Sequence, residues 1–274
     1  MLRLILALSL FAWPLATAAQ DRRPSHCIAI ADAAPGIEYL HKASFGAPLD
    51  DFTVRISYID HAMFLIETQG GLSAVTDYAG FIGTTDFAPT VATMNNGHST
   101  HWTSLPDPDI DHVLQGWATD GELADHHLDL GEMLVRNVPT DARGGFGGPM
   151  RIGGNSIFVF EVAGLCIGHL GHLHHEPDEM QYAALGRVDV VMAAVDGGLT
   201  LDLPTMTRVL KRLKSSIVIP MHWFSLSSLE RFIVGMQDEF AIDRTGPNSI
   251  EVSLRTLPDR PTVVVLTPRF LTDE

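Results

Sequence analysis

Between Phe52 and Asp77 the chain reads FTVRISYIDHAMFLIETQGGLSAVTD, in which β-branched, aromatic and other apolar residues dominate on both sides of Gly70-Gly71. Such runs favour β-strands, and a glycine pair between two runs favours a tight turn. The stretch therefore predicts consecutive strands that open the fold with a β-hairpin.

Strands and helices are expected to alternate through the rest of the chain. Short apolar runs bounded by turn residues predict strands, and apolar residues at helical spacing predict helices. The expected strands cover residues 90–94, 188–194, 216–220 and 262–266, a hairpin covers 155–169, and helices cover 178–185, 203–213 and 226–236. Residues 106–129 are expected to be loop with one strand near 113–117. This order predicts an α/β fold, specifically an αββα sandwich.

The composition is that of one globular domain with a large core. The 274 residues are 46% hydrophobic and 19% charged, and the formal net charge is −15. A strongly negative protein repels phosphate backbones and anionic lipid head groups. We therefore expect a small-molecule substrate and exclude nucleic acid as a partner.

The N-terminus has the features of a secretory signal. Residues 1–19 begin with a basic Arg3, continue as an apolar run broken by Pro14, and end in small residues. The apolar run is short for a membrane span, so cleavage is favoured over an uncleaved anchor. The sequence predicts a signal peptide at 1–19, an arm at 20–51 and a domain at 52–274. The mature protein is expected to be periplasmic or secreted, with no attachment to a membrane.

Two cysteines, Cys27 and Cys166, are present. An oxidising compartment would allow them to form a disulfide if the fold brings them together. The alternative is two unpaired thiols, with Cys166 acting as a small buried hydrophobic residue. The sequence leaves both possibilities open.

The histidines gather where predicted strands end. His98 and His101 follow the strand at 90–94, four histidines lie within residues 169–175, and His222 follows the strand at 216–220. Strand-end loops are where α/β folds place their ligands. Three or four neutral imidazoles brought together in this way would form a metal site.

The chain resembles the metallo-β-lactamase superfamily over residues 52–235, in particular its UlaG-like branch. The segments that carry the resemblance are YIDHAMFLIET at 58–68, NSIFVFE at 155–161, HLG at 169–171, GRVDV at 186–190 and IPMH at 219–222. The resemblance implies the sandwich fold and metal-dependent hydrolysis.

The family's first metal motif, His-x-His-x-Asp-His, is only half present. It falls on Asn96, His98, Thr100 and His101, so one histidine and the aspartate are replaced. The next family histidine falls near Thr140-Asp141 and is absent as well.

The later motifs retain a histidine and alter a carboxylate. The family's bridging aspartate falls on His172, while the final histidine is retained as His222. A bridging carboxylate normally holds two metal ions together, so a neutral imidazole at this position favours a mononuclear site. The metal ligands predicted from the resemblance are His98, His101, His172 and His222. Zinc is the expected ion, and imidazoles also accept iron, copper or manganese.

Other polar residues receive supporting roles. The resemblance places His61 and Asp77 behind the metal ligands and His169 in a packing role. His174 and His175 are expected near the mouth of the site. Asp196 and Asp141 are candidate proton acceptors, although either can equally be a solvated loop carboxylate.

Three functions remain open from the sequence. The first is an exported metal-dependent hydrolase that acts on a small ester, lactone, amide or phosphodiester. The second is a mononuclear iron or copper redox enzyme. The third is a periplasmic protein of the same fold that binds a metal or ligand without catalysis, because fold alone does not determine chemistry.

Overall fold

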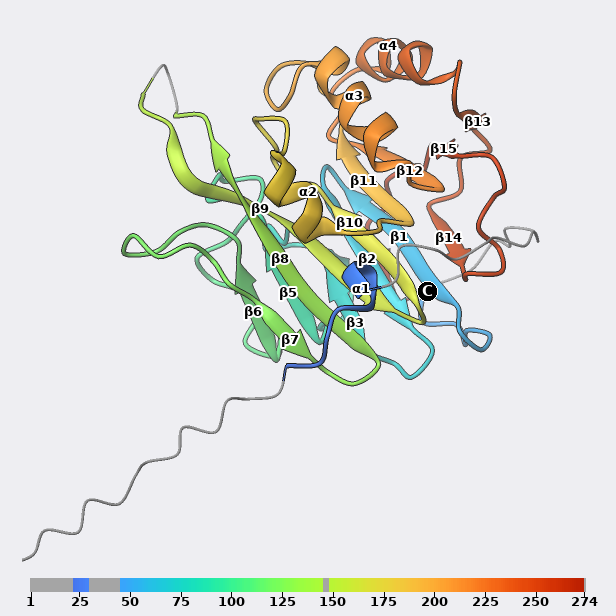
Figure 1. Ribbon diagram of the computed structural model, residues 1–274. Coiled ribbons are helices and arrows are strands. Elements are labelled where there is room, and N and C mark those ends of the chain that lie inside the picture. The colour runs from blue at the N-terminus through green and yellow to red at the C-terminus, as the bar shows by residue number, and fades with distance from the viewer. Residues whose placement is uncertain (1–21, 30–44, 145–147, 274) are drawn as a thin grey trace, which may run out of the picture.

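The protein is a sandwich of two mixed β-sheets (Figure 1). The computed structural model describes residues 22–29, 45–144 and 148–273, so the expected signal peptide lies outside the described residues. The first sheet has the order β14-β1-β2-β3-β5-β6. Its strands are β1 (Val54–Asp60), β2 (Met63–Thr68), β3 (Ser73–Val75), β5 (Val91–Met94), β6 (His112–Gln115) and β14 (Ser249–Val252). The predicted opening hairpin around Gly70-Gly71 is confirmed as the antiparallel pair β2–β3, and the run before it forms two antiparallel strands, β1 and β2.

The second sheet has the order β13-β15-β12-β11-β10-β9-β8-β7. Its strands are β7 (His127–Asp129), β8 (Met133–Ala142), β9 (Arg151–Val162), β10 (Leu165–His169), β11 (Val190–Ala194), β12 (Ile217–Met221), β13 (Ala241–Asp243) and β15 (Thr262–Val264). Strands β10, β11, β12 and β15 run parallel, so their carboxyl ends lie at one edge of the sheet. A small third sheet pairs β4 (Gly83–Thr84) with β16 (Leu271–Thr272).

The main core lies between the two large sheets. Ile56 and Phe64 of the first sheet and Phe158, Phe160 and Met192 of the second belong to this core and are completely buried. Burial of such side chains is the main favourable term in folding. The two sheets therefore form one hydrophobic unit and share a single edge on which a site can be built.

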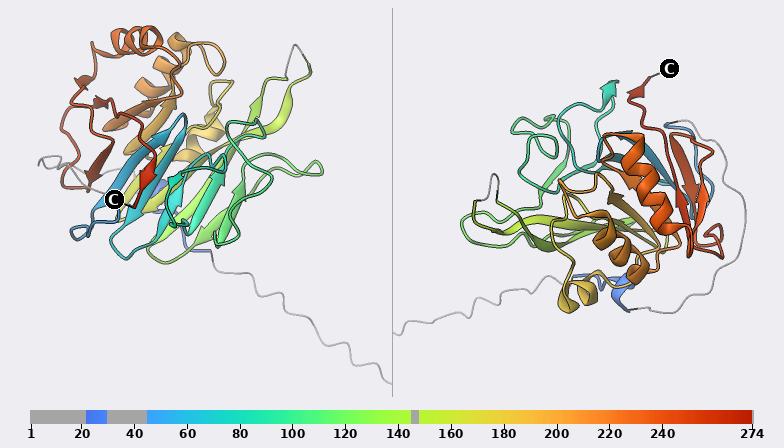
Figure 2. Two further views of the ribbon diagram at one scale, coloured as in Figure 1. Left: turned by 180° about the vertical axis from the view of Figure 1, so that it is seen from behind. Right: turned by 90° about the horizontal axis from the view of Figure 1, so that it is seen from above.

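The helices α1 (His26–Ala29), α2 (Glu179–Leu185), α3 (Leu203–Leu213) and α4 (Leu226–Met236) pack on the outer face of the second sheet (Figures 1 and 2). Asp178, Asp202 and Ser225 cap the three longer helices by accepting from backbone N–H groups in the first turn. Among the described residues, the outer face of the first sheet is covered by loops that carry Trp102 and Trp117. The α/β sandwich is confirmed, with its helices on one face.

The region before β9 is more regular than expected. The strand predicted near 113–117 is present as β6, but the same region also contains β7, and an unexpected long strand, β8, pairs with β9 over most of its length. Strand β9 also begins at Arg151, earlier than the expected start at 155. Gly153 adopts a φ of +58° within it, a backbone conformation that glycine tolerates best.

The N-terminal arm is attached covalently to the second sheet. Cys27 and Cys166 form a disulfide, which resolves the alternative left open by the sequence. Close by, buried Glu161 accepts from the backbone N–H of His26 at 3.0 Å and from Arg136 Nε at 2.7 Å. Within the described residues, no helix is long and apolar enough to cross a membrane.

Candidate metal centre

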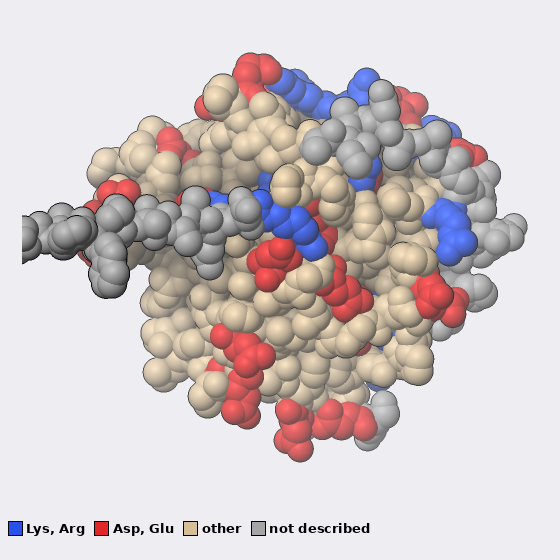
Figure 3. Space-filling model, turned by 60° about the horizontal axis from the view of Figure 1, so that its bottom comes forward, with Lys and Arg blue, Asp and Glu red and all other residues tan. Residues whose placement is uncertain are grey.

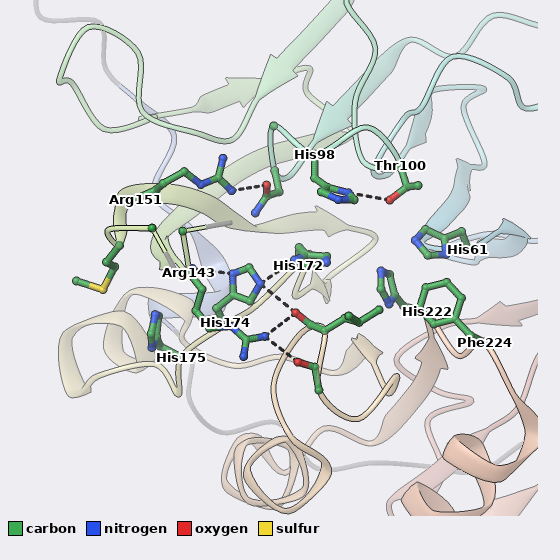
Figure 4. Close-up of a pocket in the computed structure, with 17 residues that line it drawn as sticks. His61, His98, Thr100, Arg143, Arg151, His172, His174, His175, His222 and Phe224 are labelled. Atoms are coloured by element: carbon green, nitrogen blue, oxygen red, sulfur yellow. Dashed lines mark hydrogen bonds between the residues drawn. The ribbon is translucent and has the colours of Figure 1, made fainter. Parts of the chain in front are cut away.

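The loops after β5, β10, β11 and β12 meet the turn between β1 and β2 around a pocket with a volume of about 970 Å³. Figure 4 shows its side chains converging from several of these elements. Six histidines of the described chain line the pocket: His61, His98, His172, His174, His175 and His222. The gathering of strand-end histidines that the sequence predicts is therefore present.

Three imidazoles form the tightest group. His61, His101 and His222 each offer one ring nitrogen, and these three atoms lie within 4.8 Å of one another. The ring centroids of His61 and His222 are 4.0 Å apart, and those of His101 and His222 are 5.2 Å apart. We call these three residues the histidine triad.

His101 is held by a carboxylate beneath it. Asp77 Oδ2 lies 2.6 Å from His101 Nδ1, and Asp77 Oδ1 accepts from the backbone N–H of Asn95 at 3.0 Å. Burial by itself would raise the pKa of Asp77, but the His101 imidazole lowers it, so the carboxylate is ionised. An Nδ1–H donated to Asp77 leaves His101 Nε2 as the ligand nitrogen.

His222 has a similar support on the opposite side of the site. Asp196 Oδ2 lies 3.0 Å from His222 Nδ1. The same carboxylate accepts from the backbone N–H groups of Gly198, Leu199 and Thr200 and from the Thr200 hydroxyl. Burial opposes ionisation of Asp196, but the hydrogen bonds from His222 and Thr200 prevail and hold its pKa below the usual range.

The backbone brings His61 to the triad. His61 has a φ of +49°, and its carbonyl accepts from the Tyr58 hydroxyl at 2.6 Å and from the His222 N–H at 2.9 Å. Burial, followed by the neighbouring His222 and His101 rings, lowers the pKa of His61 to about 4. His61 is therefore a neutral imidazole at neutral pH, the form that binds a metal.

His172 and His98 lie beside the triad. The His172 ring centroid is 4.6 Å from that of His101 and 5.2 Å from that of His222, and its ring stacks on His98 at 5.6 Å. His172 Nδ1 lies 3.1 Å from His174 Nε2. Burial and the surrounding histidines lower the pKa of His172 to about 2. It is thus a neutral fourth donor within reach of the same site.

The four predicted ligands thus all lie around one pocket, but they do not form a single closest group. His101 and His222 belong to the closest group, while His98 and His172 flank it. The third member of the group is His61, to which the sequence assigned a supporting role. Its one signal in the sequence is the polar pair Asp60-His61 within an apolar hairpin, and no regular spacing relates it to the other histidines.

The two candidate proton acceptors are occupied by other contacts. The hydrogen bonds of Asp196 hold the loop after β11 and face His222, which favours a positioning role. Asp141 lies on β8, where its Oδ1 accepts from the backbone N–H of Gly153 at 2.8 Å, and it is not among the described residues that line the pocket.

His169 is buried in a packing role, as expected. Its Nε2 lies 2.8 Å from the carbonyl oxygen of Ala62, and its Nδ1 lies 3.1 Å from Asn95 Nδ2. Both ring nitrogens are therefore engaged within the protein. His174 and His175 line the pocket next to Arg143, and burial together with Arg143 lowers the pKa of His174 to about 4.

The donor set fits a divalent metal ion. The Nε2 atoms of His61 and His101 are buried and have no hydrogen-bond partner among the described residues. An unsatisfied buried nitrogen is costly, and two of them directed at one cluster are explained by a shared ligand. Neutral imidazoles with buried carboxylates behind them form a common pattern in metal sites.

The comparisons with known proteins agree with this architecture. A family model described as Beta-lactamase superfamily domain matches residues 55–222, which is more than half of the chain. No curated protein matches the chain at a significant level.

Solved structures share the fold at low sequence identity. The chain is similar to a proposed Zn-dependent hydrolase of the metallo-β-lactamase superfamily from Thermotoga maritima, with 21% identity, a TM-score of 0.58, and coverage of 78% of this chain and 100% of that one. It is also similar to a proposed metal-dependent hydrolase from Parabacteroides distasonis, with 14% identity, a TM-score of 0.52, and coverage of 73% and 95%. With the family match over β1 to His222 and the sandwich that it shares with these structures, the chain belongs to the metallo-β-lactamase superfamily.

Proposed function

We propose that this protein is an exported hydrolase that uses one divalent metal ion, zinc, to cleave a small ester, lactone, amide or phosphodiester. The observation that carries the proposal is the histidine triad, in which two buried Nε2 atoms have no partner among the described residues. The names of the solved structures that share the fold, a Zn-dependent and a metal-dependent hydrolase, support the same chemistry.

A single metal ion is favoured by the charges around the triad. His172 is a neutral side chain at the position where the family resemblance implies a bridging carboxylate. On the far side of His98, Asn96 Oδ1 accepts from Arg151 Nη2 at 2.9 Å. The guanidinium places a positive charge near the position of a second metal ion and would repel it.

The residues of this chain would hold the metal ion and orient its ligands. When bound, a divalent metal ion acidifies a water molecule and polarises the carbonyl or phosphoryl oxygen of a substrate. His61, His101, His222 and His172 would hold the ion, and Asp77 would keep the His101 ring oriented. His61 and His172 stay neutral at pH 7 because burial lowers their pKa values.

Proton transfer is assigned to an imidazole. No carboxylate is found among the described residues that line the pocket, and both Asp196 and Asp141 are engaged elsewhere. His98 is exposed, lies beside His172, and has its pKa lowered by burial and by the His101 ring. A neutral, accessible imidazole at this position can accept a proton during hydrolysis.

Export is supported by the disulfide between Cys27 and Cys166, since such bonds persist in oxidising compartments. The signal-like segment at residues 1–19 points to the same location.

The test is metal content together with turnover. The tag-free mature protein, isolated without chelators, should contain about one zinc ion per chain and hydrolyse a member of an ester, lactone, amide and phosphodiester panel. His61→Ala and His101→Ala should lose both metal and activity. His112→Ala, which alters a β6 histidine outside the pocket lining, should lose neither.

Other results of this test would overturn specific parts of the proposal. Two metal ions per chain would overturn the mononuclear site, and full metal content in His61→Ala would remove His61 from the ligands. Iron or copper would move the assignment to redox chemistry. Tight zinc binding without turnover across the panel would leave a metal-binding protein that is not a hydrolase.

A further inference from the structure

The pocket has a charge opposite to that of the protein. The whole chain has a formal net charge of −15, and Asp and Glu side chains form several groups on the face shown in Figure 3. The described residues that line the pocket include Arg143 and Arg151 and no Asp or Glu. A cationic pocket in an acidic protein attracts an anion.

The two arginines differ in what their guanidinium groups already bind. Arg143 Nη2 donates to the carbonyl oxygens of Gly198, Leu199 and Thr200, at 3.0, 2.6 and 2.8 Å. Arg143 therefore holds the loop after β11 in place. Its positive charge remains at the pocket, but its Nη2 is committed to three carbonyl oxygens of the protein.

Arg151 keeps most of its donors available. In the described part of the chain, its guanidinium forms one hydrogen bond, from Nη2 to Asn96 Oδ1 at 2.9 Å. Arginine carries five N–H donors in a planar fork that matches a carboxylate or phosphate. Asn96 fixes the orientation of the fork, and the remaining donors can meet an oxyanion.

The two ends of the pocket differ in chemistry. In Figure 4 the arginines lie at one end with His174 and His175, and Phe224 lies at the other end beside His61 and His222. Phe224 is 64% exposed, and its ring centroid is 5.1 Å from that of His222. An exposed aromatic ring on a pocket wall offers a contact surface for an apolar group.

We infer that the substrate is a small amphipathic anion, whose carboxylate or phosphate group binds Arg151 while its apolar part packs on Phe224. The inference rests on the proposed hydrolase function, because it places the scissile bond between these ends, beside the histidine triad. Arg151 is then a residue that determines specificity for anionic substrates.

Binding can be measured without turnover. Phenylphosphonate and phenylacetate carry an aromatic ring with a phosphonate or a carboxylate, and their dissociation constants can be measured by calorimetry on the metal-loaded protein. Arg151→Gln should weaken binding by about ten- to one-hundredfold, the range expected for loss of a hydrogen-bonded charge. Arg151→Lys should restore part of it, and the preferred probe would identify the anionic group.

Two controls separate this inference from other effects. Arg255→Gln makes the same charge change on an exposed residue after β14, outside the pocket lining, and should leave binding unchanged. Phe224→Ala should weaken phenylphosphonate more than methylphosphonate. Equal affinity of wild type and Arg151→Gln for both aromatic probes, or no binding to wild type, would overturn the inference. Because neither result depends on hydrolysis, failure here is distinct from failure of the proposed function.

Discussion

Asp77 Oδ2 lies 2.6 Å from His101 Nδ1, and both side chains are completely buried. Asp196 Oδ2 lies within ion-pair distance of His222 Nδ1, at 3.0 Å. Two members of the histidine triad thus have an ionised carboxylate behind the ring. Such partners fix the tautomer and orientation of a metal-binding imidazole and increase its basicity.

Asp77→Asn should weaken metal binding by about ten- to one-hundredfold, as is typical when a carboxylate behind a histidine ligand is lost. The amide can still accept from the Asn95 N–H, so the fold should persist, but it lacks the charge that holds the His101 ring. Competition with a chromogenic chelator measures the affinity. Asp259→Asn, at an exposed position, is the matched control, and equal affinities of the two variants would refute the role of Asp77.

Asp196→Asn distinguishes a positioning residue from a proton acceptor. We expect metal content and activity to fall together, because the amide cannot satisfy both the backbone N–H groups of the loop and His222 Nδ1. Backbone amides of Leu199 and Thr200 should also exchange hydrogen faster. Full metal content with activity lost would instead make Asp196 the proton acceptor.

The neutral histidines make the metal-free protein sensitive to acid. Burial lowers the pKa of His61 and His174 to about 4 and that of His172 to about 2, whereas an unfolded histidine titrates near 6.5. Below about pH 6.5 the unfolded state binds more protons, so stability falls as the pH drops further. Above about pH 6.5 these histidines are neutral in both the folded and the unfolded state, so they no longer lower the stability.

Urea denaturation of the metal-free protein at pH 7, 6, 5 and 4 should show the midpoint decreasing at each step. His172→Gln should flatten this dependence, because it removes one imidazole that the fold keeps neutral. His112→Gln should have the slope of the wild type. A midpoint independent of pH over this range would contradict the assignment of neutral imidazoles.

Local patterns in the sequence were sufficient for the three longer helices but not for α1. The expected boundaries of α3 and α4 agree with the structure, because the apolar spacing and the caps at Asp202 and Ser225 are properties of adjacent residues. The hairpin β2–β3 around Gly70-Gly71 was predictable for the same reason. The resemblance to the superfamily supplied the sandwich and the location of the site.

Contacts between distant residues account for what was missed. Strand β8 contains Arg136 and Asn137, polar residues that obscure a strand pattern, and their partners Glu161 and Ala124 are far from them in sequence. The close approach of His61 to His222 depends on the packing of the first sheet against the second. A single sequence does not encode such pairs in any local spacing.

The disulfide should stabilise the fold without shaping the metal site. It links Cys27 to Cys166 across 139 residues, a separation that greatly restricts the unfolded chain. Cys27→Ser with Cys166→Ser should therefore lower the free energy of unfolding by about 2–4 kcal/mol. Metal content at pH 7 should stay that of the wild type, because Cys166 lies in β10 on the helix side of the second sheet, whereas the triad comes from loops at the strand ends.

Reductant should shift the unfolding midpoint of the wild type to that of the double variant and leave the variant unchanged. A wild type insensitive to reductant would show that the bond contributes nothing, and a variant that folds but loses its metal would show that the arm supports the site.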